Sequence, residues 1–306
     1  MRVLSTSTIN SKINENQCEF VAESEAHYGR QLDLVVQSLI DDAAQKPVIL
    51  LSGPSGSGKT SSAFRLRELL CSRGFNTYTM SMDNYFIPMG DPRTVYEPDG
   101  SVDFESPNRL ETEQLAEHLE KMWAGEEFTL PVFDFVNQKQ IAGECFRRKK
   151  NELVIFEGIH ALNPAVTGCV SEHSQGVYVS VRTRIKNSKG KLLHPSKVRL
   201  MRRLIRDKLF RGRETSWILQ SFDNVQRGEV KYILPHKCYA EHHIDTFKAY
   251  ELSVYKSFLA ANLACGEFAE HEDMATVLHE IGEVDLQHVP ANSLVREFVG
   301  GSCFEY

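Results

Sequence analysis

A glycine-rich segment constrains the fold of this chain more than any other feature. Residues 53–60 read Gly-Pro-Ser-Gly-Ser-Gly-Lys-Thr and match the pattern G-x-x-x-x-G-K-[ST]. An apolar run at 48–52 precedes the segment, and residues 61–71 carry leucines at helical spacing. In this order of strand, glycine loop and helix, backbone N–H groups surround phosphates. We therefore predict a phosphate-binding loop with the candidate ligands Gly53, Ser55, Gly56, Ser57, Gly58, Lys59, Thr60 and Ser61.

The two residues that close this loop have distinct expected roles. Lys59 can reach the β- and γ-phosphates of a nucleotide, and the hydroxyl of Thr60 can ligate Mg²⁺. The guanine-specific pattern Asn-Lys-x-Asp does not occur in the sequence, which favours ATP and leaves GTP as an alternative donor. The other interpretation, a glycine-rich turn without function, does not account for the flanking strand and helix.

Composition and charge exclude several classes of protein. The 306 residues suit one large α/β domain or two modest ones, and the net charge of −6 argues against a nucleic-acid partner. No apolar run approaches the ~20 residues of a membrane span. Seven scattered cysteines, an odd number, indicate reduced thiols and a cytoplasmic protein rather than a disulfide framework. The sequence leaves a homo-oligomer open.

Strand and helix patterns alternate along the chain. An α/β fold follows, with a mostly parallel sheet, flanking helices and ligands at the carboxyl ends of the strands. Residues 1–20 are polar and we expect them to be loose, whereas residues 87–109 form a long functional loop. Expected strands cover 48–52, 77–82, 152–157 and 176–184, and expected helices cover 28–44, 61–71, 111–123, 196–210 and 244–263.

Two acidic residues follow predicted strands, where a phosphoryl-transfer site needs them. Asp83 could accept the proton of an attacking hydroxyl or hold Mg²⁺. Glu157 ends the most apolar strand and is the expected second metal-facing group. A turn or helix-capping role for Asp83 and a solvated strand-end carboxylate for Glu157 are the structural alternatives.

A basic helix near residue 200 is the third element of the candidate site. Arg199, Arg202, Arg203 and Arg206 recur at intervals that place them on one stripe of a helix. Joined to the Arg-Gly-Arg turn at 211–213, this stripe suits a lid that closes on a triphosphate. A solvated basic helix or an RNA-binding face is the alternative, and the overall acidity disfavours RNA.

Taken together, these motifs resemble the uridine kinase and phosphoribulokinase family of P-loop kinases, most closely bacterial uridine kinase-like nucleoside kinases. The resemblance covers about residues 47–245. It rests on ordered motifs at 53–60, 81–86 (Ser-Met-Asp-Asn-Tyr-Phe), 103–107 (Asp-Phe-Glu-Ser-Pro), 133–135 (Phe-Asp-Phe), 156–159 (Phe-Glu-Gly-Ile) and 199–213.

The resemblance implies a P-loop NTPase fold like that of nucleoside monophosphate kinases, with about five parallel strands and an arginine-rich lid at about 196–214. It also implies transfer of the γ-phosphate of ATP or GTP to a hydroxyl. On this basis residues 47–264 are the kinase domain. Residues 1–46 form an extension with one amphipathic helix, and 265–306 form a tail packed on the core or a partner.

Residue roles carry over from the resemblance motif by motif. Asp83 is the implied general base, and Lys59, Arg206 and Arg213 are the other catalytic candidates. Thr60, Asp83 and Glu157 are the implied metal ligands. Arg203 and Arg211 join the phosphate-binding set. The implied substrate-binding residues are Asp83, Tyr85, Phe86, Glu105, Phe133, Gln138 and Arg206, with Glu105 on the ribose hydroxyls.

The sequence departs from uridine kinases in the nucleobase pocket. Phe133 stands where those enzymes carry a tyrosine, and Gln138 replaces a histidine that contacts the pyrimidine. Ser221 occupies the place of a base-reading glutamine. The expected acceptor is a ribonucleoside such as uridine or cytidine, phosphorylated at the 5′-hydroxyl. The alternatives are a sugar phosphate or other small alcohol, and a nucleotide-binding regulator without phosphotransfer.

Overall fold

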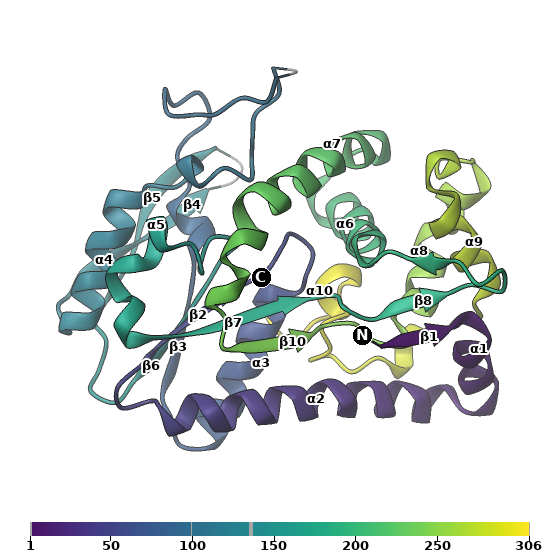
Figure 1. The fold of residues 1–306 in the computed structure, drawn as a ribbon, viewed down its shortest axis with the longest axis horizontal. Coiled ribbons are helices and arrows are strands. Elements are labelled where there is room, and N and C mark those ends of the chain that lie inside the picture. Colours follow the sequence, from purple (N-terminus) through teal and green to yellow (C-terminus); the bar gives the residue numbers. More distant parts are fainter. Residues whose placement is uncertain (1, 99, 135–136, 306) are drawn as a thin grey trace.

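The computed structural model describes residues 2–98, 100–134 and 137–305, and a five-stranded parallel sheet forms its centre (Figure 1). The strands lie in the order β10-β7-β2-β6-β3. This sheet confirms the predicted P-loop fold. Its members are β2 (Val48–Ser52), β3 (Thr77–Ser81), β6 (Leu153–Glu157), β7 (Ser174–Ser180) and β10 (His242–Asp245).

Helices cover both faces of this sheet because its central strands are apolar on both sides. Ile49 and Leu51 of β2 enter one core, whereas Val48 and Leu50 enter the other. On the first face lie α2 (Gln17–Asp41), α3 (Lys59–Ser72), α6 (Pro195–Arg211) and α8 (Glu251–Ala264); on the second lie α4 (Thr112–Ala124) and α5 (Pro164–Thr167).

Smaller elements surround the central layers. The strand β1 (Val3–Ser5) pairs in parallel with β8 (Arg184–Lys186), which also pairs with β9 (Leu192–Leu193). An antiparallel hairpin joins β4 (Phe128–Asp134) to β5 (Lys139–Phe146). The remaining helices are α1 (Thr6–Glu15), α7 (Thr215–Gly228), α9 (Glu272–Glu280) and α10 (Arg296–Val299).

Residues 3–20 form regular structure, contrary to the prediction that residues 1–20 are loose. Ser5 caps α1 by accepting a hydrogen bond from the Thr8 N–H at 3.0 Å. Ile9 and Ile13 of α1 are buried in the core that α2 shares. The helix was not predicted because only one narrow face of it meets the core, and the rest of its residues are polar.

A second difference concerns residues 242–264, which form a strand and a helix rather than one helix. Residues His242–Asp245 pair with β7 at the edge of the sheet, and α8 begins only at Glu251. The strand has four residues, and only Ile244 among them is apolar, so its pattern is too short to reveal it.

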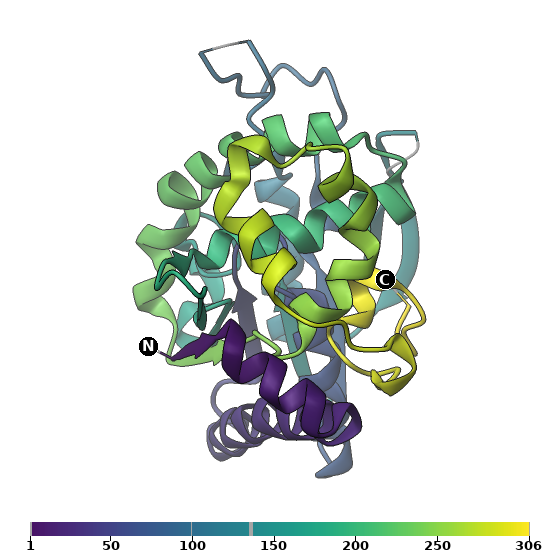
Figure 2. The same cartoon turned by 90° about the vertical axis from the view of Figure 1, so that its right-hand side faces the viewer.

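The C-terminal segment folds back over the body of the molecule (Figure 2). Leu294, Val295 and Phe298 are fully buried and belong to the core that contains α3 and α6. None of the helices in the described ranges is both long and apolar enough to cross a membrane.

Candidate active site

The phosphate-binding loop connects the central strand β2 to α3, as its sequence predicts. A Cβ atom on Gly53 would lie 2.1 Å from the Val179 carbonyl oxygen of the neighbouring strand, so only glycine fits there. Gly58 has a φ of +84° and immediately precedes α3, whose first residue is Lys59. The loop therefore points the N-terminus of α3, an anion-binding element, at the end of the sheet.

Arginines of α6 hold this loop from behind. The Arg199 Nη1 donates to the Ser55 carbonyl oxygen at 3.1 Å, and the Arg202 Nη1 donates to the Gly56 carbonyl oxygen at 3.1 Å. Arg203 Nη1 donates to Ser55 Oγ at 2.6 Å. These contacts keep the backbone of the loop in place beside the cavity.

The predicted arginine stripe is therefore not a lid along its whole length. Arg202 is fully buried and forms an ion pair with Glu251, 2.8 Å between Nε and Oε2. Arg199 is almost fully buried and pairs with Glu229. Both face the core because α6 is apolar on several sides, so neither is free to close over a triphosphate.

The C-terminal end of α6 does present arginines to the cavity. Asp207, which is 2% exposed, pairs with Arg206 at 2.9 Å, with Arg211 at 3.2 Å and with Arg203 at 3.7 Å. Burial would raise the pKa of Asp207, but these three guanidinium groups hold it below its ordinary value. Asp207 belongs to none of the candidate residues predicted above, yet it gathers the arginines into one cluster.

Two acidic side chains meet at the carboxyl ends of β3 and β6. Glu157 Oε1 accepts hydrogen bonds from Thr60 Oγ1 at 3.2 Å and from Ser81 Oγ at 3.0 Å. Burial, followed by the nearby charge of Asp83, raises the pKa of Glu157. Lys59 opposes this shift.

This donor set fits Mg²⁺. Two carboxylates and a hydroxyl, from Asp83, Glu157 and Thr60, are hard oxygen ligands, and all three residues line one cavity. The raised pKa of Glu157 is the electrostatic mark of a buried carboxylate that a cation would relieve. Thr60 and Glu157 therefore lie where the sequence predicts them.

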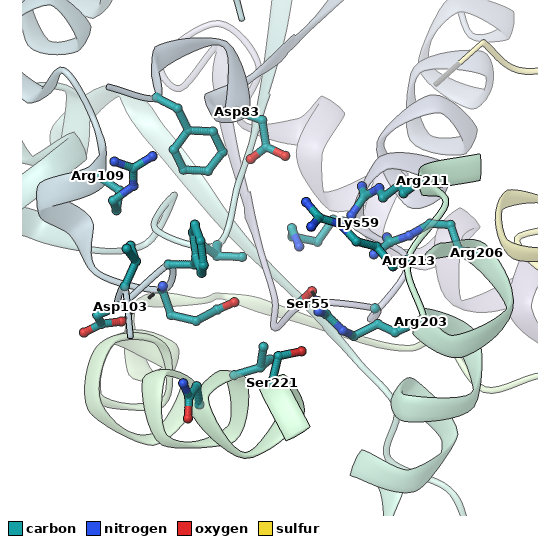
Figure 3. Close-up of a pocket in the computed structure, with 18 of the residues that line it drawn as sticks. Ser55, Lys59, Asp83, Asp103, Arg109, Arg203, Arg206, Arg211, Arg213 and Ser221 are labelled. Atoms are coloured by element: carbon teal, nitrogen blue, oxygen red, sulfur yellow. Dashed lines mark hydrogen bonds between the residues drawn. The ribbon is translucent and has the colours of Figure 1, made fainter. Parts of the chain in front are cut away.

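A cavity of about 980 Å³ joins the phosphate loop to a second group of residues. Figure 3 shows Lys59 gathered with four arginines at one end, Asp103 and Arg109 at the other, and Asp83 between them. Most of the site residues predicted from the sequence line this cavity. They are Ser55, Gly56, Gly58, Lys59, Thr60, Asp83, Phe86, Glu105, Phe133, Gln138, Glu157, Arg203, Arg206, Arg211 and Arg213.

Glu105 is a further buried carboxyl group in the lining of the cavity, within reach of the charges of Arg203 and Lys59. In the described chain its Oε2 atom is buried without a hydrogen-bond partner. Burial raises the pKa of Glu105 to about 7, against the opposing charges of Arg203 and Lys59. Gly228 at the end of α7 permits this position, because a Cβ there would lie 2.2 Å from the Glu105 Cβ.

Aromatic rings line the same cavity. Phe86 and Phe133 meet edge to face with their centroids 5.9 Å apart. The backbone of Phe133 is held in place because its N–H donates a hydrogen bond to Asn84 Oδ1 at 3.2 Å. Gln138 lies in the turn of the β4–β5 hairpin with a φ of +52°.

Four predicted ligands do not line the cavity. Tyr85 is buried in the second core, and its hydroxyl bonds His118 Nδ1 at 3.0 Å, because the short helix Met82–Tyr85 turns it toward α4. Its predicted substrate contact is thus wrong. Gly53 packs against β7, Ser57 is fully buried, and Ser61 bonds Glu297 instead. Phe135, part of the family motif, lies outside the described residues.

Several lining residues had no signal in the sequence. Trp217 of α7 lies under the Arg213 guanidinium, with 4.6 Å from Cζ to the ring centroid. Asp103 accepts a hydrogen bond from the Tyr232 hydroxyl at 2.8 Å. Glu297 reaches the cavity from the C-terminal segment. Asp103 lies within the motif at 103–107 but was not itself selected. Trp217 and Glu297 belong to no motif, and no spacing rule links them to the phosphate loop.

Comparisons with known proteins agree with this geometry. The phosphoribulokinase / uridine kinase family model matches residues 48–253, more than half of the chain. A uridine kinase of Borreliella burgdorferi (strain ZS7) is 29% identical over 199 residues, covering 63% of this chain and 84% of that protein. A uridine kinase of Halobacterium salinarum is 24% identical over 192 residues, covering 62% and 76%.

Solved structures show the same fold. A possible uridine kinase from Bacillus stearothermophilus has a TM-score of 0.51 and 15% identity, and the match covers 71% of this chain and 98% of that one. At this level of identity the likeness concerns the fold and leaves the acceptor undecided.

Proposed function

We propose, since the chain belongs to the phosphoribulokinase / uridine kinase family, that it transfers the γ-phosphate of ATP to the 5′-hydroxyl of a ribonucleoside. Uridine and cytidine are the first candidates, and GTP is an alternative donor. The family supports kinase activity, and the choice of acceptor is the part that we infer from the cavity.

One observation supports this proposal most directly. The lining of the cavity combines cations, Lys59 and the arginine cluster, with the buried carboxyl group of Glu105, whose Oε2 atom has no hydrogen-bond partner in the described chain. Cations suit phosphates, whereas a buried carboxylate oxygen suits a hydroxyl donor. A molecule that carries both phosphate and hydroxyl groups therefore suits this cavity.

Residues of this cavity can move the proton and stabilise the charge. Asp83 lies between the cluster of Lys59 and arginines and the pair Asp103 and Arg109 in Figure 3, where it can accept the proton of the attacking hydroxyl. Lys59 and Arg206 can neutralise charge on the transferring group. Bound Mg²⁺, held by Thr60, Asp83 and Glu157, would neutralise phosphate charge as well.

Arg109 supports the second candidate, an acceptor that itself carries an anionic group such as a sugar phosphate. Its side chain is 3% exposed and lines the cavity near Asp103. Within the described chain its hydrogen bonds go to neutral acceptors, among them the carbonyl of Ile87 at 3.1 Å and Thr94 Oγ1 at 3.3 Å. Asp91 acts on Arg109 electrostatically but forms its ion pair with Arg93, and a buried guanidinium without a bonded carboxylate suits an anion.

A screen of ADP release over nucleosides, sugar phosphates and pantothenate tests the proposal. We expect turnover with a ribonucleoside and a loss of about 10²–10⁴-fold in the single-turnover rate of Asp83→Asn, which is nearly isosteric but cannot take the proton. Lys59→Ala is the control for the phosphate end. Turnover with non-nucleosides alone would replace the nucleoside by the second candidate, and full activity of Asp83→Asn would remove the base.

A further inference from the structure

The C-terminal segment covers the phosphate-binding loop. Leu294 packs so closely on Gly58 that a Cβ atom there would lie 2.3 Å from the leucine Cδ1. Phe298 lies beneath the Arg202 guanidinium, 5.2 Å from Cζ to the ring centroid. The first contact is with the loop itself, and the second is with Arg202, which bonds the loop at Gly56. Together they fix residues 294–298 against the loop.

Glu297 of this segment binds the first turn of α3. Its Oε2 atom accepts a hydrogen bond from Ser61 Oγ at 2.5 Å and from the Ser61 N–H at 3.4 Å. Ser61 is the third residue of α3 and directly follows the loop. The N–H groups here are the ones that cradle the α- and β-phosphates in a loop of this type.

A carboxylate and a phosphate cannot share these donors without cost. Two negative charges within about 4 Å repel each other, most strongly where the surroundings exclude water. Ser61 is fully buried and Glu297 is half-buried, so the contact is partly shielded from solvent. Glu297 also lines the cavity.

We propose that Glu297 is a built-in competitor of the nucleotide. Its carboxylate occupies donors that belong to the α-phosphate, so binding of ATP or ADP displaces Glu297 from Ser61. The inference rests on the proposed use of a nucleotide by this loop. It makes the C-terminal segment a determinant of nucleotide affinity rather than a passive tail.

The segment is anchored in a way that allows this control. Ser293 Oγ donates to Glu25 Oε1 of α2 at 2.7 Å and accepts a hydrogen bond from the Val295 N–H at 3.2 Å. Glu25 in turn binds the buried ammonium of Lys248 at 2.6 Å. Helix α2 therefore holds the segment that carries the competing carboxylate in place.

Titration calorimetry with ADP on the full-length protein tests the proposal. In Glu297→Gln the amide oxygen can still accept from Ser61, so the cap on α3 survives while the charge is lost. We expect ADP to bind about tenfold more tightly to this variant. Glu283→Gln, which removes an exposed charge from the same part of the chain, is the matched control and should bind ADP like the wild type.

A second variant provides an independent test. Ser293→Ala removes the anchor without touching the phosphate loop, and we expect it also to tighten ADP binding. Unchanged or weaker ADP binding in both variants would show that Glu297 only caps the helix and would overturn the inference. If the wild type binds neither ADP nor ATP, the proposed function is wrong, and the inference about Glu297, which rests on it, is wrong as well.

Discussion

At the scale of single residues, the surroundings shift the pKa values of two buried carboxyl groups in this site in opposite directions. Asp207 has three arginines around it, and its pKa is lowered despite burial. Glu105 has cations only at a distance, and burial raises its pKa to about 7. Asp207 therefore stays charged and organises the arginines, whereas Glu105 titrates near neutral pH.

The titration of Glu105 predicts a pH dependence of stability. The folded state holds this proton up to about pH 7, whereas an ordinary glutamate loses it near 4.5. In that window the folded state binds more protons than the unfolded state, so the free energy of unfolding falls as pH rises through it. Above pH 7 this contribution is constant.

Glu105→Gln cannot titrate and should lose this dependence. Relative to the wild type, we expect the variant to gain about 3 kcal/mol of stability between pH 4.5 and pH 8. Urea denaturation of the ligand-free proteins at several pH values measures the difference. Parallel curves for the two proteins would show that Glu105 is charged throughout and that the unpartnered oxygen is not desolvated.

At the scale of elements, helix α6 has two parts with different tasks. Arg199 and Arg202 lie in the core and bind the backbone of the phosphate loop. Arg206 and Arg211 lie near its end, beside the cavity. The first part fixes the loop, and the second offers positive charge to a ligand.

Substitutions in the two parts of α6 should therefore separate stability from rate. Arg202→Met leaves Glu251 charged and unpaired in the core, and we expect a loss of about 3–5 kcal/mol in the free energy of unfolding. Arg206→Ala should lower the single-turnover rate by about 10²-fold while the apo melting temperature changes little.

Chemical denaturation and rapid-quench measurements on both variants provide the comparison. The double variant Arg202→Met, Glu251→Leu should regain most of the lost stability, because no charge is then left unpaired. A strongly destabilised Arg206→Ala protein would instead mean that this arginine is structural, like Arg202.

The sequence predicts α6 itself but not this division. Arginines at helical spacing identify the helix and its basic stripe. They do not reveal that Arg202 meets Glu251, which is 49 residues away and in another helix. For the same reason the loop Gly53–Thr60 and the strand that ends at Glu157 are predictable, since their signals are local. Glu297 is not, because its contact with Ser61 spans 236 residues.

At the scale of the whole molecule, both ends of the chain belong to the core that supports the site. Glu25 of α2 and Ser293 of the C-terminal segment are in direct contact, 268 residues apart. The sequence divides the chain into an extension, a kinase domain and a tail, and these parts share one apolar core. Composition does not show such docking, because it depends on long-range contacts.

The cavity is likewise built from distant segments. Glu105 comes from the loop after β3, Phe133 and Gln138 from the hairpin, and Trp217 from α7. For the ribonucleoside that we propose as acceptor, each would supply a different chemistry: a carboxylate for hydroxyl groups, a flat face for a base, an amide at its edge, and an aromatic wall. A ligand with both a base and a sugar would use all of them.

This assembly predicts discrimination between ribose and deoxyribose. If Glu105 accepts hydrogen bonds from the vicinal hydroxyls, a 2′-deoxyribonucleoside leaves part of the carboxylate unpaired in a buried site. We expect kcat/KM for 2′-deoxyuridine to be at least about 10²-fold below that for uridine. Steady-state kinetics with saturating ATP measure the ratio of the two kcat/KM values. Glu105→Gln is the internal control, since it should reduce this ratio mainly by lowering kcat/KM for uridine. Equal rates for the two nucleosides would contradict the ribose contact and leave Glu105 facing some other acceptor.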